Sequence, residues 1–182
     1  GSDCIALTQK GAECFALDYS IGALEVSKKL MNKKGVHISI LSGDCRHLPF
    51  KNETFDAVFS VGLVEHFKDL SPVLYEQSRV LKQSGFLVLD VPQKFSLYTI
   101  VKHVRSLVGK NPFGWETEFS VKDLGRLSSL LNLKCVGFYY RDSAFQYLLP
   151  KKIKRRCETR FKRIENSILT FPLSIGAIYR KE

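Results

Sequence analysis

The segment that most constrains the fold is residues 55–67, with the sequence FDAVFSVGLVEHF. Its first half is a short run rich in β-branched and aromatic residues, and Gly62 ends it. A continuous apolar run of this length is typical of a strand that is buried on both faces, as in a parallel sheet covered by helices. The polar pair Glu65-His66 follows. Because ligands of open α/β sheets bind beyond the carboxyl ends of the strands, we expect a ligand near this pair.

Apolar runs and helix signals alternate along the first half of the chain. Strands are predicted at residues 13–17, 36–41, 57–61 and 86–91, and helices at residues 2–10, at residues 21–32 and from Ser71 onward. Gly11 and Gly35 stand where a glycine typically ends a helix. This alternation predicts an α/β fold, a three-layer α/β/α sandwich with a mostly parallel sheet. Further strands at residues 133–140 and 174–179 predict an antiparallel hairpin at the end.

Length and composition are those of one ordinary globular domain. The chain has 182 residues, of which 45% are hydrophobic and 25% charged. Its apolar stretches are all shorter than the roughly 18 residues that a membrane span needs. The five cysteines are scattered and form no C-x-x-C pair, so the sequence indicates neither a disulfide framework nor a metal site. We expect a reduced, cytoplasmic setting.

The net charge of +10 is concentrated in one segment. Between Lys151 and Arg163 there are eight Lys or Arg residues and one Glu, so the rest of the chain carries only +3. The favoured interpretation is a solvated helix face with an apolar stripe against the core. Two others stay open, an anionic membrane surface and nucleic acid. Of these the membrane is preferred, because no aromatic stacking residues alternate with the charges.

Two carboxylates follow neighbouring predicted strands, Asp18 after the first and Asp44 after the second. A carboxylate at such a position in a nucleotide-binding fold can accept hydrogen bonds from both ribose hydroxyls. One on the next strand can accept a hydrogen bond from an adenine amino group. Asp also serves simply to cap or turn a chain. Two carboxylates in register, with Gly43 beside one of them, favour an adenosine-binding edge.

Several motifs occur in a fixed order along the first half of the chain. They are a spacing of seventeen positions from Gly1 to Asp18, Gly43-Asp44 with Leu48-Pro49-Phe50, Phe55-Asp56, Glu65-His66, and Arg79-Val80-Leu81-Lys82 with Gly85. In this order and spacing they resemble the class I S-adenosylmethionine-dependent methyltransferases, in the group that acts on small molecules, quinones and lipids. The match covers residues 1–92. One departure is Gln83-Ser84, which replaces a Pro-Gly of the family and is a tolerable variant of the turn.

The resemblance implies a Rossmann-like methyltransferase fold, with a cofactor-binding half at residues 1–92 and an acceptor-side half at residues 93–182. It implies that Asp18 binds the ribose of S-adenosylmethionine with Tyr19 beside it, and that Asp44 and Cys45 hold the adenine. Val61 and Gly62 would pass close to the methionine portion.

The resemblance also bears on the start of the chain. In the family a first strand and a glycine-rich loop precede the acidic residue, so we expect a chain truncated at the amino terminus, with Gly1 the last glycine of that loop. A second interpretation of Gly1-Ser2 stays open, namely two residues added by cloning, in which case the spacing to Asp18 is chance.

The implied reaction is an in-line transfer of a methyl group to a small or lipid-like acceptor. The protein mainly aligns the partners, and a general base is needed only if the acceptor must lose a proton. His66 is the candidate base, because an ordinary imidazole titrates near neutral pH. The alternative for His66 is a purely structural role at the start of a helix.

Two alternatives to a methyltransferase are kept. One is a non-catalytic binding or scaffold domain of the same fold. The other is a short-chain dehydrogenase, since Tyr98 and Lys102 have the spacing of that family's Tyr/Lys pair, although they follow the preceding strand too closely. Aromatic residues are frequent at residues 95–119, where the resembled family often covers its acceptor site. Packing on the sheet explains them equally well.

Overall fold

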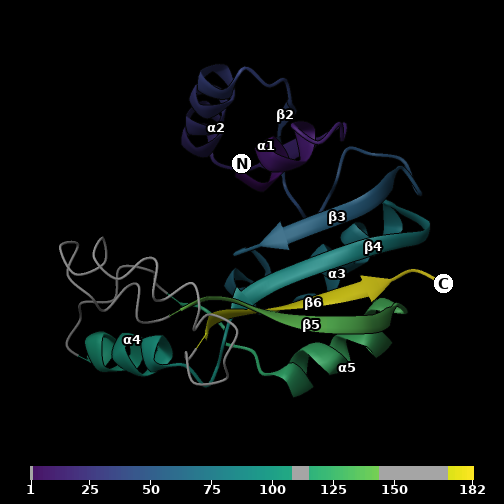
Figure 1. Ribbon diagram of the computed structural model, residues 1–182. Coiled ribbons are helices and arrows are strands. Elements are labelled where there is room, and N and C mark those ends of the chain that lie inside the picture. Colours follow the sequence, from purple (N-terminus) through teal and green to yellow (C-terminus); the bar gives the residue numbers. More distant parts are fainter. Residues whose placement is uncertain (1, 108–114, 144–171) are drawn as a thin grey trace. The chain divides into compact units, whose positions relative to one another are not determined.

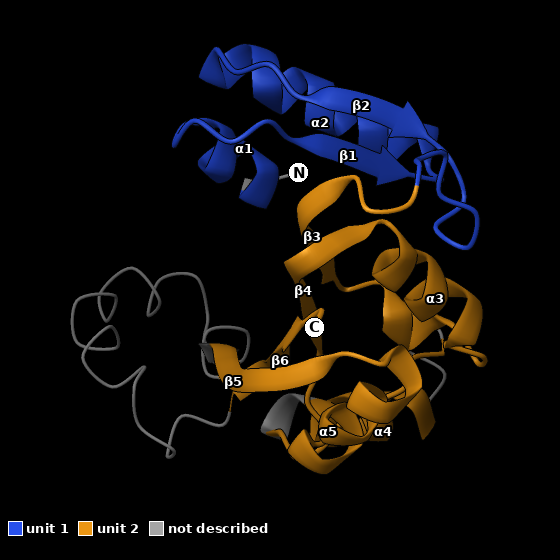
Figure 2. Ribbon diagram, turned by 90° about the vertical axis from the view of Figure 1, so that its right-hand side faces the viewer, with its two compact units in different colours: residues 1–51 blue, residues 52–182 orange. Residues whose placement is uncertain are grey.

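The computed structural model describes residues 2–107, 115–143 and 172–182 (Figure 1). The chain divides into two compact units, residues 1–51 and residues 52–182 (Figure 2). Each unit is described by itself below. The α/β fold class is confirmed, because helices alternate with strands that pair mostly in parallel along the first half of the chain. The single domain of residues 1–182 and the missing first strand stay predictions.

The first unit is a two-stranded parallel sheet with two helices. Its elements are α1 (Ser2–Thr8), β1 (Phe15–Asp18), α2 (Ile21–Lys34) and β2 (Ser39–Ser42). The Ser20 hydroxyl caps α2 by accepting from the Ala23 N–H, and Gly35 ends the helix with a left-handed φ of 63°. The predicted helix boundaries at these two residues are therefore correct within two residues. Ile5, Met31 and Ile38 form the core of this unit.

The second unit is a four-stranded mixed sheet with helices. Its elements are β3 (Phe55–Val61), the 3-10 turn η1 (Val64–His66), α3 (Ser71–Arg79), β4 (Leu81–Pro92), α4 (Leu97–Leu107), α5 (Val121–Leu131), β5 (Lys134–Ser143) and β6 (Pro172–Arg180). The strand order is β3-β4-β6-β5. β3 and β4 are parallel, whereas β6 runs antiparallel to both β4 and β5 (Figure 1). The predicted antiparallel pairing of the last two strands is confirmed.

One face of this sheet carries the core of the unit. Along β4 the side chains of Leu87, Leu89 and Val91 are buried, whereas Phe86 on the opposite face is exposed. Helices α3 and α5 cover the buried face (Figures 1 and 2). The Tyr179 hydroxyl on β6 donates to the Leu124 carbonyl of α5 at 2.7 Å, which satisfies a buried polar group between helix and sheet.

The prediction that the strand at residues 57–61 is buried on both faces is wrong. Within its sheet β3 lies at the edge and pairs only with β4. The side chains of Phe59 and Val61 are 48% and 40% exposed, and only Ser60 is fully buried. An apolar run indicates a strand, but an edge strand and a central strand can have the same apolar sequence pattern. The local sequence does not encode which neighbours pair with the strand.

Two of the sequence motifs meet at the amino end of β3. The Lys82 ammonium donates to Asp56 Oδ1 at 2.9 Å, so the Phe-Asp motif and the Arg-Val-Leu-Lys motif are joined directly. Ser84, which stands where the family has glycine, has a φ of 63°. A Cβ on Gly85 would lie 2.8 Å from the Lys82 carbonyl oxygen, so a side chain cannot fit there without moving the backbone. The close Lys82 carbonyl explains why the motif has glycine at position 85. The left-handed φ of Ser84 means that a strained residue precedes this glycine.

The basic segment between Lys151 and Arg163 lies outside the described residues, as do Gly1, Phe113 and Cys157. Among the helices in the described ranges, none is long and apolar enough to cross a membrane. Within the same ranges no group of three or more His, Cys, Asp or Glu residues could hold a metal ion.

Candidate functional site

Asp18 and Asp44 follow the carboxyl ends of two paired strands in the first unit. Asp18 is the last residue of β1 and is paired with Ser42, the last residue of β2. The Gly43 N–H donates to the Asp18 carbonyl at 3.2 Å, which continues the parallel ladder beyond β2. The structure therefore brings Asp18 and the Gly43-Asp44 turn to one edge of the sheet, as predicted.

The side chain of Asp18 is well suited to accept hydroxyl groups. Its Oδ1 accepts the Ser20 N–H at 2.8 Å, which fixes the carboxylate at the start of α2. Within the described part of the chain its Oδ2 makes no hydrogen bond. Tyr19 beside it is 82% exposed. A carboxylate held by one oxygen, with the other facing solvent, can bind a diol such as a ribose.

Asp44 is held by its neighbour Arg46. The Arg46 Nη2 donates to Asp44 Oδ2 at 2.6 Å, and the Arg46 backbone N–H donates to Oδ1 at 2.9 Å. These hydrogen bonds lower the pKa of Asp44 to about 2, so the carboxylate stays ionised at neutral pH. An adenine amino group would share this carboxylate with Arg46. The sequence did not predict that partner.

Cys45 and Gly43, the two residues next to Asp44, limit the chemistry and the space available at this sheet edge. Burial raises the pKa of the half-buried Cys45 thiol, and the Asp44 carboxylate adds to the shift. Cys45 is therefore a neutral contact at neutral pH and no activated nucleophile. A Cβ on Gly43 would lie 3.1 Å from Leu17 Cδ1, so a side chain at this turn fits only if the Leu17 side chain shifts by a few tenths of an ångström.

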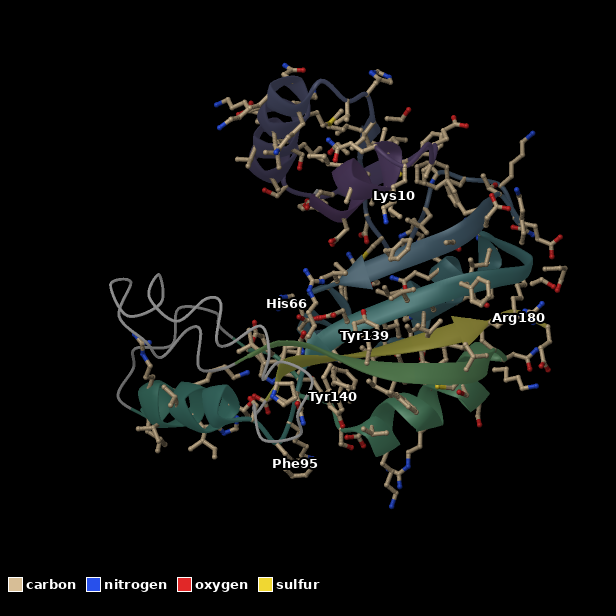
Figure 3. All side chains as sticks on the ribbon, viewed as in Figure 1. Lys10, His66, Phe95, Tyr139, Tyr140 and Arg180 are labelled. Carbon is tan, nitrogen blue, oxygen red and sulfur yellow. The ribbon has the colours of Figure 1, made fainter. Side chains whose placement is uncertain are left out.

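The carboxyl end of β3 in the second unit carries the other predicted site residues. Val61 is paired with Asp90 on β4, and the Gly62 N–H donates to the Asp90 carbonyl at 3.0 Å. Gly62 has a φ of 63°, a backbone conformation that favours glycine. The chain then enters η1, which holds Glu65 and His66. β3 therefore ends at Val61, Gly62 follows it, and the next turn brings His66 to the same strand end. Figure 3 shows His66 beside the tip of β3.

Glu65 is the residue of this turn that sequence reasoning missed. Its side chain is only 3% exposed, and in the described part of the chain its Oε2 has no hydrogen-bond partner. Burial raises the pKa of Glu65, and the carboxylates of Glu116 and Asp90 contribute to the shift. His66, which was chosen as the titrating group, is exposed instead. The sequence predicts that the pair Glu65-His66 lies near the ligand, but it does not determine which of the two adjacent side chains points inward.

Asp90 adds a second buried carboxylate at this strand end. It is 4% exposed and lies 3.7 Å from the Arg141 guanidinium of β5. Glu65 and Asp90 are thus two buried carboxyl groups at one strand end, and the Arg141 guanidinium lies near Asp90.

Lys102 is unavailable for the role that the dehydrogenase alternative gives it. Its ammonium lies 3.1 Å from Glu116 Oε2 and 2.5 Å from Glu118 Oε1, and its side chain is 7% exposed. Burial opposes the charge on Lys102, but the hydrogen bonds to Glu118 and Glu116 outweigh it and raise the pKa. An ammonium held by two carboxylates is an anchor for α4.

Comparison with known proteins agrees with this geometry. Residues 1–89 match a family described as a methyltransferase domain. Residues 1–89, just under half of the chain, therefore belong to this methyltransferase domain family. A demethylmenaquinone methyltransferase of Thermobifida fusca is 39% identical over 93 residues, which cover 49% of this chain and 38% of that protein. One of Bacteroides fragilis is 31% identical over 142 residues, which cover 75% of this chain and 49% of that protein.

Solved methyltransferase structures share the fold. A SAM-dependent methyltransferase from Archaeoglobus fulgidus superposes with a TM-score of 0.64 at 16% identity, covering 96% of this chain and 78% of that one. At this identity the likeness concerns the fold alone. The chain spans less than half the length of the two demethylmenaquinone methyltransferases that it matches.

The methyltransferase site residues thus fall into two groups. Asp18, Tyr19, Asp44 and Cys45 lie at the sheet edge of the first unit, and Val61, Gly62 and His66 at the strand end of the second. Gly1 lies outside the described residues. The roles of all eight residues stay predictions.

Proposed function

We propose that this chain is the methyl-transferring part of an enzyme that uses S-adenosylmethionine to methylate a small or lipid-like acceptor. The observation that carries the proposal is the register of β1 and β2, which brings Asp18 and the Gly43-Asp44 turn to one edge of the sheet. This is the arrangement that adenosine recognition requires.

The donor set at this edge fits the cofactor. Asp18 would accept the ribose hydroxyls, Tyr19 would lie over the sugar, and Asp44 with Cys45 would contact the adenine. Val61 and Gly62 would approach the methionine part, and Gly1 would do so from the start of the chain. The features that support this assignment are the Asp18 Oδ2, which accepts no hydrogen bond in the described part of the chain, and the left-handed backbone of Gly62.

When bound, the cofactor supplies a methyl group on a positively charged sulfur. The chain's own contribution is to align the acceptor and to exclude water. His66 is exposed beside the strand end, so it can take a proton from an acceptor at its imidazole nitrogen. Glu65, buried and with a raised pKa, is the second group that can hold a proton there.

The acceptor is proposed from the relatives. Two of those reported above are named demethylmenaquinone methyltransferases, so a quinone with an apolar tail is the first acceptor to test. We place the reaction in the cytoplasm. The basic segment between Lys151 and Arg163 is one candidate for contact with an anionic membrane surface.

A non-catalytic binding domain is the second candidate function. Such a domain would bind the cofactor or its product without turnover.

The test is a calorimetric titration of S-adenosylhomocysteine into the full chain, its Asp18→Ala variant and a Glu25→Ala control. Glu25 is an exposed carboxylate on α2 in the same unit. Saturable binding that only Asp18→Ala abolishes supports the cofactor site. Transfer of labelled methyl from S-adenosylmethionine to a demethylmenaquinone then supports the enzyme, whereas binding without transfer to any acceptor favours the binding domain. Equal binding by all three chains would refute the site.

A further inference from the structure

Helix α4 has polar side chains on its inner side. The Thr99 hydroxyl donates to the Gln93 carbonyl at 2.6 Å, and the Ser96 hydroxyl accepts the Thr99 N–H at 3.1 Å. One turn later Lys102 is buried between Glu116 and Glu118. Thr99 and Lys102 are three residues apart, so they share one side of the helix. These contacts fix the side of α4 that faces the rest of the second unit.

The outer side of α4 is apolar. Ile100, Val104 and Leu107 are 60%, 58% and 88% exposed, and their spacing of four and then three residues places them on one stripe. Phe95, just before the helix, is 71% exposed. A surface helix of a globular protein normally buries its apolar stripe and exposes its polar one. In α4 this order is inverted.

The charges around this stripe are positive. Residues 94–110 contain four Lys or Arg residues and no Asp or Glu. Lys94 and Arg105 are exposed, as is His103, which flanks the stripe. The carboxylates of Glu116 and Glu118 hold Lys102, and Glu118 also lies 3.0 Å from His103 Nε2. Lys94 and Arg105 remain as exposed cations beside the stripe, in a segment without Asp or Glu.

We propose that α4 is a membrane-docking helix that lies in the surface of an anionic phospholipid bilayer. Aliphatic side chains would enter the boundary between headgroups and acyl chains, while Lys94 and Arg105 would meet the lipid phosphates. An apolar stripe flanked by cations is the pattern of helices that lie in a bilayer surface. An eleven-residue helix is too short to cross the bilayer, so it lies on the membrane.

The anchoring contacts suit this role. Because Thr99 and Lys102 fix the orientation of α4, the stripe is presented without the cost of ordering a free helix. The inference does not depend on the proposed methyl transfer, since docking needs neither the cofactor nor an acceptor. If the acceptor is lipid-like, docking would bring the chain to where that acceptor dissolves.

The test is co-sedimentation of the full chain with vesicles of phosphatidylcholine alone or mixed with phosphatidylglycerol. The decisive variant is Ile100→Ser with Val104→Ser and Leu107→Ser. The matched control is Val26→Ser with Tyr75→Ser and Leu130→Ser, three exposed apolar residues on other helices. We expect wild type and control to bind only the anionic vesicles, and the stripe variant to lose at least about tenfold in partition coefficient, because it removes apolar surface that burial in lipid would stabilise.

Three outcomes would overturn the proposal. Wild type could fail to bind anionic vesicles. The stripe variant could bind as wild type does, which would assign binding to the segment between Lys151 and Arg163. The stripe variant could instead change the oligomeric state or lower the midpoint of thermal unfolding, which would mean that a second copy or the chain itself covers the stripe. Leu107→Trp is a further check, because it should tighten vesicle binding without a threat to folding at a position that is 88% exposed.

Discussion

The Gly43 N–H donates to the Asp18 carbonyl at 3.2 Å, and this hydrogen bond joins the ends of the two strands that carry the predicted cofactor carboxylates. The bond uses the backbone of Asp18 and leaves its Oδ2 free within the described residues. Backbone pairing and ligand binding are therefore separate properties of Asp18, and a substitution can remove one without the other.

We expect Asp18→Asn to weaken binding of S-adenosylhomocysteine by roughly 10- to 100-fold, because a hydrogen bond to a charged acceptor contributes about 1.5–3 kcal/mol. The Asn side chain can still accept the Ser20 N–H, so the start of α2 should stay capped. Calorimetric titration measures the affinity, and thermal unfolding checks that the midpoint is unchanged. An unchanged affinity would remove Asp18 from the cofactor site.

We expect the stability of the protein to depend on pH through Glu65. Burial raises the pKa of Glu65, so the folded protein keeps the proton at pH values where the unfolded chain has lost it. The free energy of unfolding should therefore fall as pH rises from the pKa of the unfolded chain through that of the folded protein. Glu65→Gln cannot ionise, so it should lack this fall and be more stable than wild type at neutral pH.

Urea unfolding of wild type, Glu65→Gln and Glu25→Gln, across the acidic to neutral range, checks this dependence. Glu25 is exposed, so its variant should follow the wild-type curve. Parallel curves for wild type and Glu65→Gln would mean that Glu65 does not carry the pH dependence.

The sequence predicted the parts of this molecule that local chemistry determines. Gly35 ends α2 in a left-handed conformation, and Asp18 and Asp44 follow paired strands. Each depends on residues close in the chain. Three features depend on which distant segments pack against each element, so the local sequence could not predict them. They are the partial exposure of β3, the inward orientation of the Glu65 side chain and the exposed apolar stripe of α4.

Ser84 gives a test of backbone strain. It has a φ of 63°, which costs a residue other than glycine about 1–2 kcal/mol. Its backbone N–H donates to the Lys181 carbonyl at 2.9 Å, a contact that glycine would keep. We expect Ser84→Gly to raise the free energy of unfolding by about 0.5–1 kcal/mol, after the greater freedom of glycine in the unfolded chain is subtracted.

Asn132→Gly is the matched control for this substitution. Asn132 has a φ of 51° at the end of α5, and Asn tolerates the left-handed region better than Ser does. Its replacement should change stability by less than that of Ser84. Chemical denaturation measures both, and a neutral or destabilising Ser84→Gly would show that this turn is not strained.

Lys102 is the anchor on which the orientation of α4 depends. Lys102→Met would leave Glu116 without its ammonium partner and Glu118 with His103 alone, and each carboxylate is less than 15% exposed. Removing one member of a buried ion network costs about 3 kcal/mol, so we expect a loss of that size in the free energy of unfolding. Lys122→Met, at an exposed position of α5, is the control and should be near neutral.

The triple variant Lys102→Met with Glu116→Gln and Glu118→Gln separates charge from packing. If the cost comes from unpaired buried carboxylates, the triple variant should recover most of the stability that Lys102→Met loses. Urea unfolding of all three variants measures this recovery. If the triple variant is no more stable than Lys102→Met, the contribution of Lys102 lies in the packing of its side chain, and the ion network does not hold α4.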